Sequence, residues 1–281
     1  TIYVSEFNAE TSTGWTTTAV TNSTSMFSNC TNIIGGNGTT YNNNIINKTY
    51  AVIDTATTPG YLTNINKNKQ LNRLISASSV APNGKYLNST IIKNKIETIE
   101  FKLGKEKPEG TIEAFDASEK QDESIMAYYT DTDGNGLYKL TFLSPEIIAT
   151  NKDAGYLFQN LSSVKNIKFD NFSTYGANKM NFMFGGCKEI IEINLSKFDT
   201  SYVTDIQGMF YNCASIKTLD VSKFNTSEVK SFCSNEAWRA NGTFQDCTSL
   251  ENIDISSWDT SKATSFCKMF SGCSSLVNLN V

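Results

Sequence analysis

The stretch MFYNCASI, Met209–Ile216, decides the fold because close variants of it recur along the chain. The variants read MFSNCTNI from Met26, MFGGCKEI from Met183 and MFSGCSSL from Met269. Self-similarity at a fixed period of about 20 to 50 residues is typical of stacked repeat proteins, whereas a scattered functional motif has no fixed period. The spacing of these phrases therefore distinguishes a structural repeat from a motif.

The spacing is regular. Phe158, Phe184 and Phe210 are 26 residues apart, Phe210 and Phe244 are 34 apart, and Phe244 and Phe270 are again 26 apart. One repeat thus carries eight extra residues, SNEAWRAN at 234–241, which we expect to form a loop that leaves the stack in register.

Each repeat contains one short segment that alternates between apolar and polar residues. Two apolar columns recur, Ile193, Leu219, Ile253 and Leu279, and Leu195, Val221, Ile255 and Val281, with Asn194, Asp220, Asp254 and Asn280 between them. This alternation predicts a strand with one buried face. We expect the first column to form a buried row of a parallel sheet.

A turn and a helix are predicted after this strand. An aromatic column, Phe172, Phe198, Phe224 and Trp258, is followed by FDTS, FNTS or WDTS, whose residues favour capped turns. Val203, Ile206, Phe210 and Cys213 then recur at intervals of 3, 4 and 3, which predicts one apolar face of a short helix. The expected fold is an α/β repeat solenoid, a leucine-rich-repeat-like stack of short parallel strands with short helices, plus β-rich capping segments.

The repeats resemble the BspA-like variety of leucine-rich repeat found in bacterial surface proteins, with its phrase MFxxCxxLxxLDLSxFDTSxVTxM. The resemblance is close over about residues 155–281. It implies a secreted or cell-wall-attached adhesin that contacts host proteins or other cells.

Four segments are expected along the chain. Residues 1–63 resemble the last repeat and C-terminal cap of one array, and residues 64–85 are a polar connector without periodicity. Residues 86–157 are the N-terminal β cap of a second array, with strands at ETIEFKL, SIMAYYT and GLYKLTF. Residues 158–281 are the repeats. We expect the chain to be part of a longer tandem protein, continued end to end by further repeats or by copies of itself.

Composition argues against several classes of function. A net charge of −4 gives no positive field for nucleic acid, and no apolar run reaches the roughly 20 residues needed for membrane insertion. The chain has no histidine, so Ser-His-Asp and Cys-His catalysis are excluded. Its closest cysteines, Cys267 and Cys273, lack zinc-site spacing. We therefore predict no enzymatic activity and no cofactor.

The turn sequence DTDGNG has two interpretations. Asp131, Asp133 and Asn135 match the first oxygen ligands of an EF-hand calcium loop, but Phe142 stands where that loop needs a bidentate Glu. A hairpin turn selects the same residues without an ion.

The cysteines fall into two groups. Cys187, Cys213, Cys247 and Cys273 share a column with Leu161, which predicts core packing. Cys233 and Cys267 share a column with Asn181 and Gln207 and are expected to be exposed. They lie one repeat apart and either form a disulfide in an oxidising compartment or remain free thiols.

One face of the stack is the candidate binding surface. The outward strand positions Glu192, Asn194, Thr218, Asp220, Asn252 and Asp254 line it, although solvation alone accounts for polar residues there. The aromatic column is expected to point inward as core and not to form a platform for carbohydrate. Trp15 and Trp238, in two insertions, are candidate exposed contacts. The two function hypotheses are an extracellular adhesin and a structural subunit of an extracellular stalk, filament or surface layer.

Overall fold

The computed structural model describes residues 2–4, 21–28, 30, 44, 47, 51, 62–64, 71–77, 86–87, 89–233 and 241–281. The chain divides into two compact units, Thr1–Gln70 and Leu71–Val281. In the first unit, β1 (Ile2–Val4) pairs in parallel with β2 (Leu62–Asn64), and Phe27 is buried. Most of the predictions for residues 1–63 lie outside the described residues. The predicted connector at 64–85 contains a strand, β3 (Leu71–Arg73), which belongs to the second unit.

The second unit contains a five-stranded sheet. Its spatial order is β5 (Thr111–Asp116), β6 (Met126–Thr130), β7 (Tyr138–Ser144), β4 (Ile96–Leu103) and β9 (Asn166–Lys168). Strands β5, β6 and β7 are antiparallel neighbours, whereas β4 runs parallel to β7 and β9. The three predicted strands and the β6–β7 hairpin are thereby confirmed. The 3-10 turn η3 (Lys93–Lys95) leads into β4.

Strand β9 connects this sheet to the repeats. It belongs to the first repeat, and each repeat forms one coil of the stack. Its Ile167 nevertheless pairs with Ile99 of β4, and both side chains are buried. A three-stranded parallel sheet, β10 (Phe172–Ser173), β8 (Ile147–Ala149) and β3 (Leu71–Arg73), lies beside it in the same unit. The first coil therefore continues a core that the sheet has already begun.

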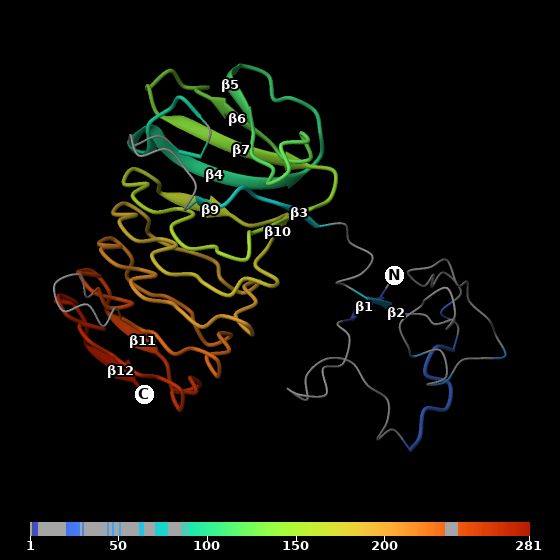
Figure 1. Cartoon of the computed structure of the whole chain (residues 1–281), viewed down its shortest axis with the longest axis vertical. Coiled ribbons are helices and arrows are strands. Elements are labelled where there is room, and N and C mark those ends of the chain that lie inside the picture. Colours follow the sequence, from blue (N-terminus) through green and yellow to red (C-terminus); the bar gives the residue numbers. More distant parts are fainter. Residues whose placement is uncertain are drawn as a thin grey trace. The chain divides into compact units, whose positions relative to one another are not determined.

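The repeats stack as successive coils in sequence order, from the yellow to the red part of the chain (Figure 1). Phenylalanine rings from each coil stack along the core, with centroid separations of 5.3 Å for Phe158–Phe184, 5.6 Å for Phe184–Phe210, 5.6 Å for Phe210–Phe244 and 5.4 Å for Phe244–Phe270. The stack keeps its register between Phe210 and Phe244, where the sequence carries the extra residues. Residues 234–240 themselves lie outside the described residues.

The predicted α/β solenoid with short helices is wrong. No α-helix occurs in the described residues, and the segment from Val203 to Cys213 is a run of turns. Its amides alternate between two kinds of acceptor. Met209 and Cys213 donate to the residue three positions back, whereas Phe210 and Asn212 donate to carbonyl groups of the next coil. A helix would use all of these amides internally, so bonding between coils replaces it.

One column of left-handed residues interrupts the helical conformation in each coil. Asn160, Asn212 and Asp246 have φ values of 60°, 56° and 61°, and Gly186 and Gly272 occupy the equivalent places with φ of 81° and 79°. L-residues other than Gly, Asn and Asp adopt this conformation at a cost of roughly 1–2 kcal/mol. This energetic cost explains why the residue directly before each repeated cysteine, and before Leu161 in the first repeat, is Asn, Gly or Asp.

The predicted buried row is only partly correct. Ile193, Leu219 and Ile253 are buried, but Leu279 is 43% exposed because no further coil covers it in this structure. Strands form in this column only at β9, at β11 (Asn252–Asp254) and at β12 (Asn278–Asn280), where β11 and β12 pair in parallel. The aromatic column points inward, as predicted, with Phe172, Phe198, Phe224 and Trp258 all buried.

Buried polar side chains also join the coils. Thr200 Oγ donates to the Asn225 carbonyl at 2.9 Å and accepts from the Asn225 amide at 2.8 Å. The repeated cysteines Cys187, Cys213, Cys247 and Cys273 each donate Sγ–H to the carbonyl oxygen of a phenylalanine in the preceding coil, at 3.0 to 3.2 Å. The predicted burial of Cys187, Cys213 and Cys247 is confirmed, and Cys273 is partly buried.

Candidate functional site

The candidate site is a polar groove built from two rows of outward side chains that cross the strands and coils. Pairing of β4 with β7 and β9 aligns Lys139, Thr98 and Asn166 in the first row, and Thr141, Glu100 and Lys168 in the second. The 26-residue repeat continues the first row through Glu192, Thr218 and Asn252, and the second through Asn194, Asp220 and Asp254. The predicted face therefore extends onto the sheet that precedes the repeats.

Three hollows follow these rows, and neighbouring hollows share lining residues. The lysine hollow, about 210 Å³, is lined by Thr98, Ile99, Glu100, Lys139, Asn166 and Lys168. The middle hollow, about 480 Å³, shares Asn166 and Lys168 with it and adds Asp170, Glu192, Asn194 and Asp220 among others. The terminal hollow, about 680 Å³, shares Asp220 and adds Thr218, Asn252 and Asp254 among others. The structure thus brings together all six residues predicted for the binding face.

The second-row carboxylates of the groove are held by local turns. Asp220 Oδ1 accepts hydrogen bonds from the backbone N of Ser222 at 3.0 Å and from its hydroxyl at 2.7 Å, and Asp254 Oδ1 does the same with Ser256. Hydrogen bonds from the Ser222 hydroxyl and amide lower the pKa of Asp220, and the equivalent bonds from Ser256 lower the pKa of Asp254. Both side chains are therefore charged at neutral pH.

Amides reinforce the acidic end of the groove. Asn280 Nδ2 donates to Asp254 Oδ2 at 2.9 Å. Asn194 closes the same turn as Asp220 without a charge, because its Oδ1 accepts from the Ser196 amide at 3.1 Å and from its hydroxyl at 2.7 Å. The turn at Asn194 and at Asp220 uses a side-chain oxygen alone, so the negative charge at Asp220 is additional to the structural need.

A buried carboxylate sits at the other end of the groove. Glu100 is 6% exposed and forms ion pairs with Lys102 at 2.8 Å and Lys139 at 2.9 Å, while Thr141 donates to it at 2.9 Å. Burial raises the pKa of Glu100, but the hydrogen bonds from Lys102, Lys139 and Thr141 outweigh burial and leave it lowered. With Lys168 exposed beside this cluster, the end near β4 carries more positive than negative charge.

The sequence interpretation missed Glu100, Lys139 and Lys168. The 26-residue period does not reach β4 and β7, so Glu100 and Lys139 belong to no repeat column, whereas Lys168 stands one period before Asn194 and could have been found from the repeat. The alternation of Thr98, Glu100 and Lys102 within one strand was a usable signal for a polar face. Only the parallel pairing of β4 with β9 shows that this face is continuous with that of the repeats.

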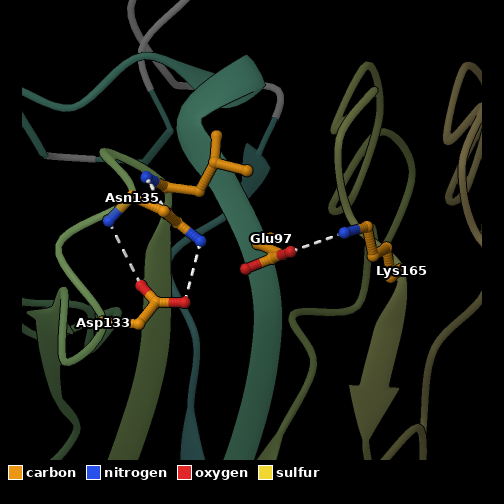
Figure 2. A network of polar contacts seen from close by, with 5 residues as sticks. Glu97, Asp133, Asn135 and Lys165 are labelled. Carbon is orange, nitrogen blue, oxygen red and sulfur yellow. Dashed lines mark hydrogen bonds and ion pairs between the residues drawn. The ribbon is translucent and has the colours of Figure 1, made fainter.

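The candidate calcium residues close the β6–β7 turn. Asp133 accepts hydrogen bonds from the amide and the side chain of Asn135 (Figure 2). Asn135 Oδ1 accepts from the Leu137 amide at 2.7 Å. Asp131 Oδ2 accepts from the Gly136 amide at 3.1 Å. These oxygens serve the turn, and the described residues include no group of three or more His, Cys, Asp or Glu that could hold a metal ion.

A surface ion pair lies beside this turn. The Glu97 carboxylate on β4 points toward Lys165 and accepts a hydrogen bond from its Nζ at 2.7 Å (Figure 2). The bond from Lys165 and a weaker one from Asn135 lower the pKa of Glu97, and the same ion pair raises the pKa of Lys165. The pair fastens β4 to the residue that precedes β9, one strand away.

Cys233 and Cys267 are joined by a disulfide, with their Cα atoms 5.7 Å apart. It links two neighbouring coils next to the insertion. The expectation that both residues are exposed is wrong, because Cys233 is 1% exposed, with its Sγ 3.0 Å from the Ser265 hydroxyl oxygen, and Cys267 is partly buried. Trp15 and Trp238, the candidate exposed contacts, lie outside the described residues.

Comparison with known proteins places the chain near one family. A family model described as "Mycoplasma protein of unknown function, DUF285" matches residues 3–67 and 152–276. No curated protein and no solved structure gives a significant match. No helix in the described part of the chain is long and apolar enough to cross a membrane.

Proposed function

The chain belongs to the DUF285 family, and we propose that it is a BspA-like, non-enzymatic surface protein that attaches to proteins outside the cell through its polar groove. The observation that carries the proposal is the continuity of the groove. Polar side chains cross β7, β4, β9 and three further coils in two aligned rows, which is an extended surface of the kind that stacked-repeat proteins use for binding.

The cysteine chemistry favours a secreted location. Disulfides such as Cys233–Cys267 persist in oxidising compartments and are rare in the cytosol. Burial raises the pKa of Cys187 to about 12 and the pKa of Cys213 well above its usual value, so these thiols are poor nucleophiles. These two thiols are therefore better suited to packing than to catalysis.

The binding proposal is tested by attachment of the whole chain to surfaces. Fluorescently labelled protein is applied to cultured animal cells and to immobilised extracellular-matrix proteins, together with a variant in which Thr218→Arg and Asn252→Arg obstruct the terminal hollow. Thr260→Arg, at an exposed position outside the groove, is the matched control. We expect saturable attachment that the groove variant loses and the control retains. Attachment unaffected by the groove variant would contradict the proposal.

The alternative proposal is a structural subunit of an extracellular stalk, filament or surface layer. The repetition of the same coil-to-coil contacts favours it, since a phenylalanine stack and backbone bonds in constant register can be extended without new interactions. Sedimentation velocity over a wide concentration range tests it. Growing assemblies would support the subunit, and a constant monomer would leave only the binding role.

A further inference from the structure

The charge of the groove changes sign along its length. Lys139 and Lys168 line the lysine hollow around the single carboxylate of Glu100. The middle hollow is lined by Lys168 and by the three carboxylates of Asp170, Glu192 and Asp220. The terminal hollow has Asp220 and Asp254 and no basic side chain in its lining. A ligand of uniform charge would be attracted at one end and repelled at the other.

The shape and chemistry of the groove favour a polypeptide over a sugar. Carbohydrate recognition commonly uses an exposed aromatic face, but Phe169, the one aromatic residue in the lining of the three hollows, is buried. The lining combines aliphatic side chains with amides, hydroxyls and carboxylates that can bond to a main chain and to charged side chains. The acidic majority of the charged lining disfavours nucleic acid.

The groove length fits a short extended segment. Neighbouring strands and coils are spaced about 4.8 Å apart. Lys168 on β9 and Asp254 on β11 are therefore roughly 14 Å apart. Lys139 on β7 is two strands farther along, roughly 24 Å from Asp254. An extended chain advances about 3.3 Å per residue, which corresponds to about four to seven residues between the opposite charges.

We infer that the groove binds an extended, charge-segregated polypeptide segment, whose acidic end lies against Lys139 and Lys168 and whose basic end lies against Asp220 and Asp254. The inference rests on the proposed binding function and names the partner class for the same groove. Lys139 and Lys168 repel a basic segment that continues past β9, and the carboxylate of Glu100 is already paired with Lys102 and Lys139, so the sign change selects against uniformly basic chains.

The test uses two labelled peptides of identical composition, with equal numbers of Glu and Lys and about five neutral residues. In one peptide the Glu residues precede and the Lys residues follow the neutral residues, and in the other the charges alternate. Binding to the whole chain is followed by fluorescence anisotropy at low and at physiological salt. The test variant is Asp220→Asn with Asp254→Asn, which keeps both turns because Asn194 closes the same turn with an amide oxygen.

The matched control is Asp259→Asn. Asp259 is exposed, closes an equivalent turn with Ser261 and lines none of the three hollows. We expect the segregated peptide to bind at least about tenfold more tightly than the alternating one, the double variant to lose most of this difference, and the control to keep it. The difference should shrink as salt is added.

Two outcomes would overturn the inference: equal binding of the two peptides, or a preference that survives the double variant. If the chain nevertheless attaches to cells and loses attachment in the Thr218→Arg and Asn252→Arg variant, the proposed function stands and only the partner class is wrong. If the chain attaches to nothing and also binds neither peptide, both proposals fail.

Discussion

Replacing Thr200 by Val tests whether side-chain hydrogen bonds hold the coils together. Thr200 is 2% exposed, and its hydroxyl serves both the amide and the carbonyl of Asn225 in the next coil. Val keeps nearly the same volume but leaves both backbone groups without their partner. Each buried polar group left unsatisfied costs about 1–3 kcal/mol. Because both hydrogen bonds to Asn225 are only part-buried, we take the lower part of this range for each and expect Thr200→Val to lower the free energy of unfolding by about 2–4 kcal/mol.

Two further substitutions separate this effect from packing. Thr200→Ser keeps the hydroxyl and removes a methyl group, so its cost should be about 1 kcal/mol. Thr260→Val changes the equivalent residue of a later coil, where the side chain is exposed, and should be nearly neutral. The free energies come from urea unfolding followed by circular dichroism, and hydrogen exchange shows whether the amides near Asn225 open first. A Thr200→Val variant as stable as Thr200→Ser would refute the reasoning.

Three other changes probe the turns, the disulfide and a buried acid. Asn212 has φ of 56°, so Asn212→Val should lower the free energy of unfolding by roughly 1–2 kcal/mol, whereas Asn212→Gly should leave it almost unchanged. Equal urea midpoints for the two variants would argue against strain at this position. Reduction of Cys233–Cys267, which closes 34 residues, should lower stability by about 2–4 kcal/mol, and a Cys233→Ser, Cys267→Ser double variant should show the same loss and no response to reductant. Desolvation raises the pKa of Asp205 above 3.8, so this carboxyl contributes stability below its unfolded pKa and loses that contribution as the pH rises through the folded pKa. Asp205→Asn should therefore be more stable than the parent at pH 7, with the gain vanishing below about pH 3.8; a gain that persisted at low pH would exclude the carboxyl as its source.

The sequence by itself determined the repeat and its buried columns. A constant period places the same residue at the same depth in every coil, so Phe184, Phe210 and Phe244 had to share one stack if any of them was buried. The alternation of Ile193, Asn194 and Leu195 also identified the outward face correctly, because side chains of an extended segment alternate between core and solvent. The position of the extra residues follows from the same register.

The tertiary structure alone decided how each coil is bonded and how far the face extends. The spacing of Val203, Ile206, Phe210 and Cys213 matches a helical face, but it records only which residues are buried, and these are buried in turns whose amides bond to the next coil. The sequence shows the Asn, Gly and Asp residues that adopt left-handed φ, yet their backbone amides donate to carbonyl groups 25 or 33 residues away in the next coil. The continuity of the groove onto β4 and β7 likewise depends on strand pairing between segments that share no repeat, and pairing partners are fixed by packing and hydrogen bonds that no local pattern encodes.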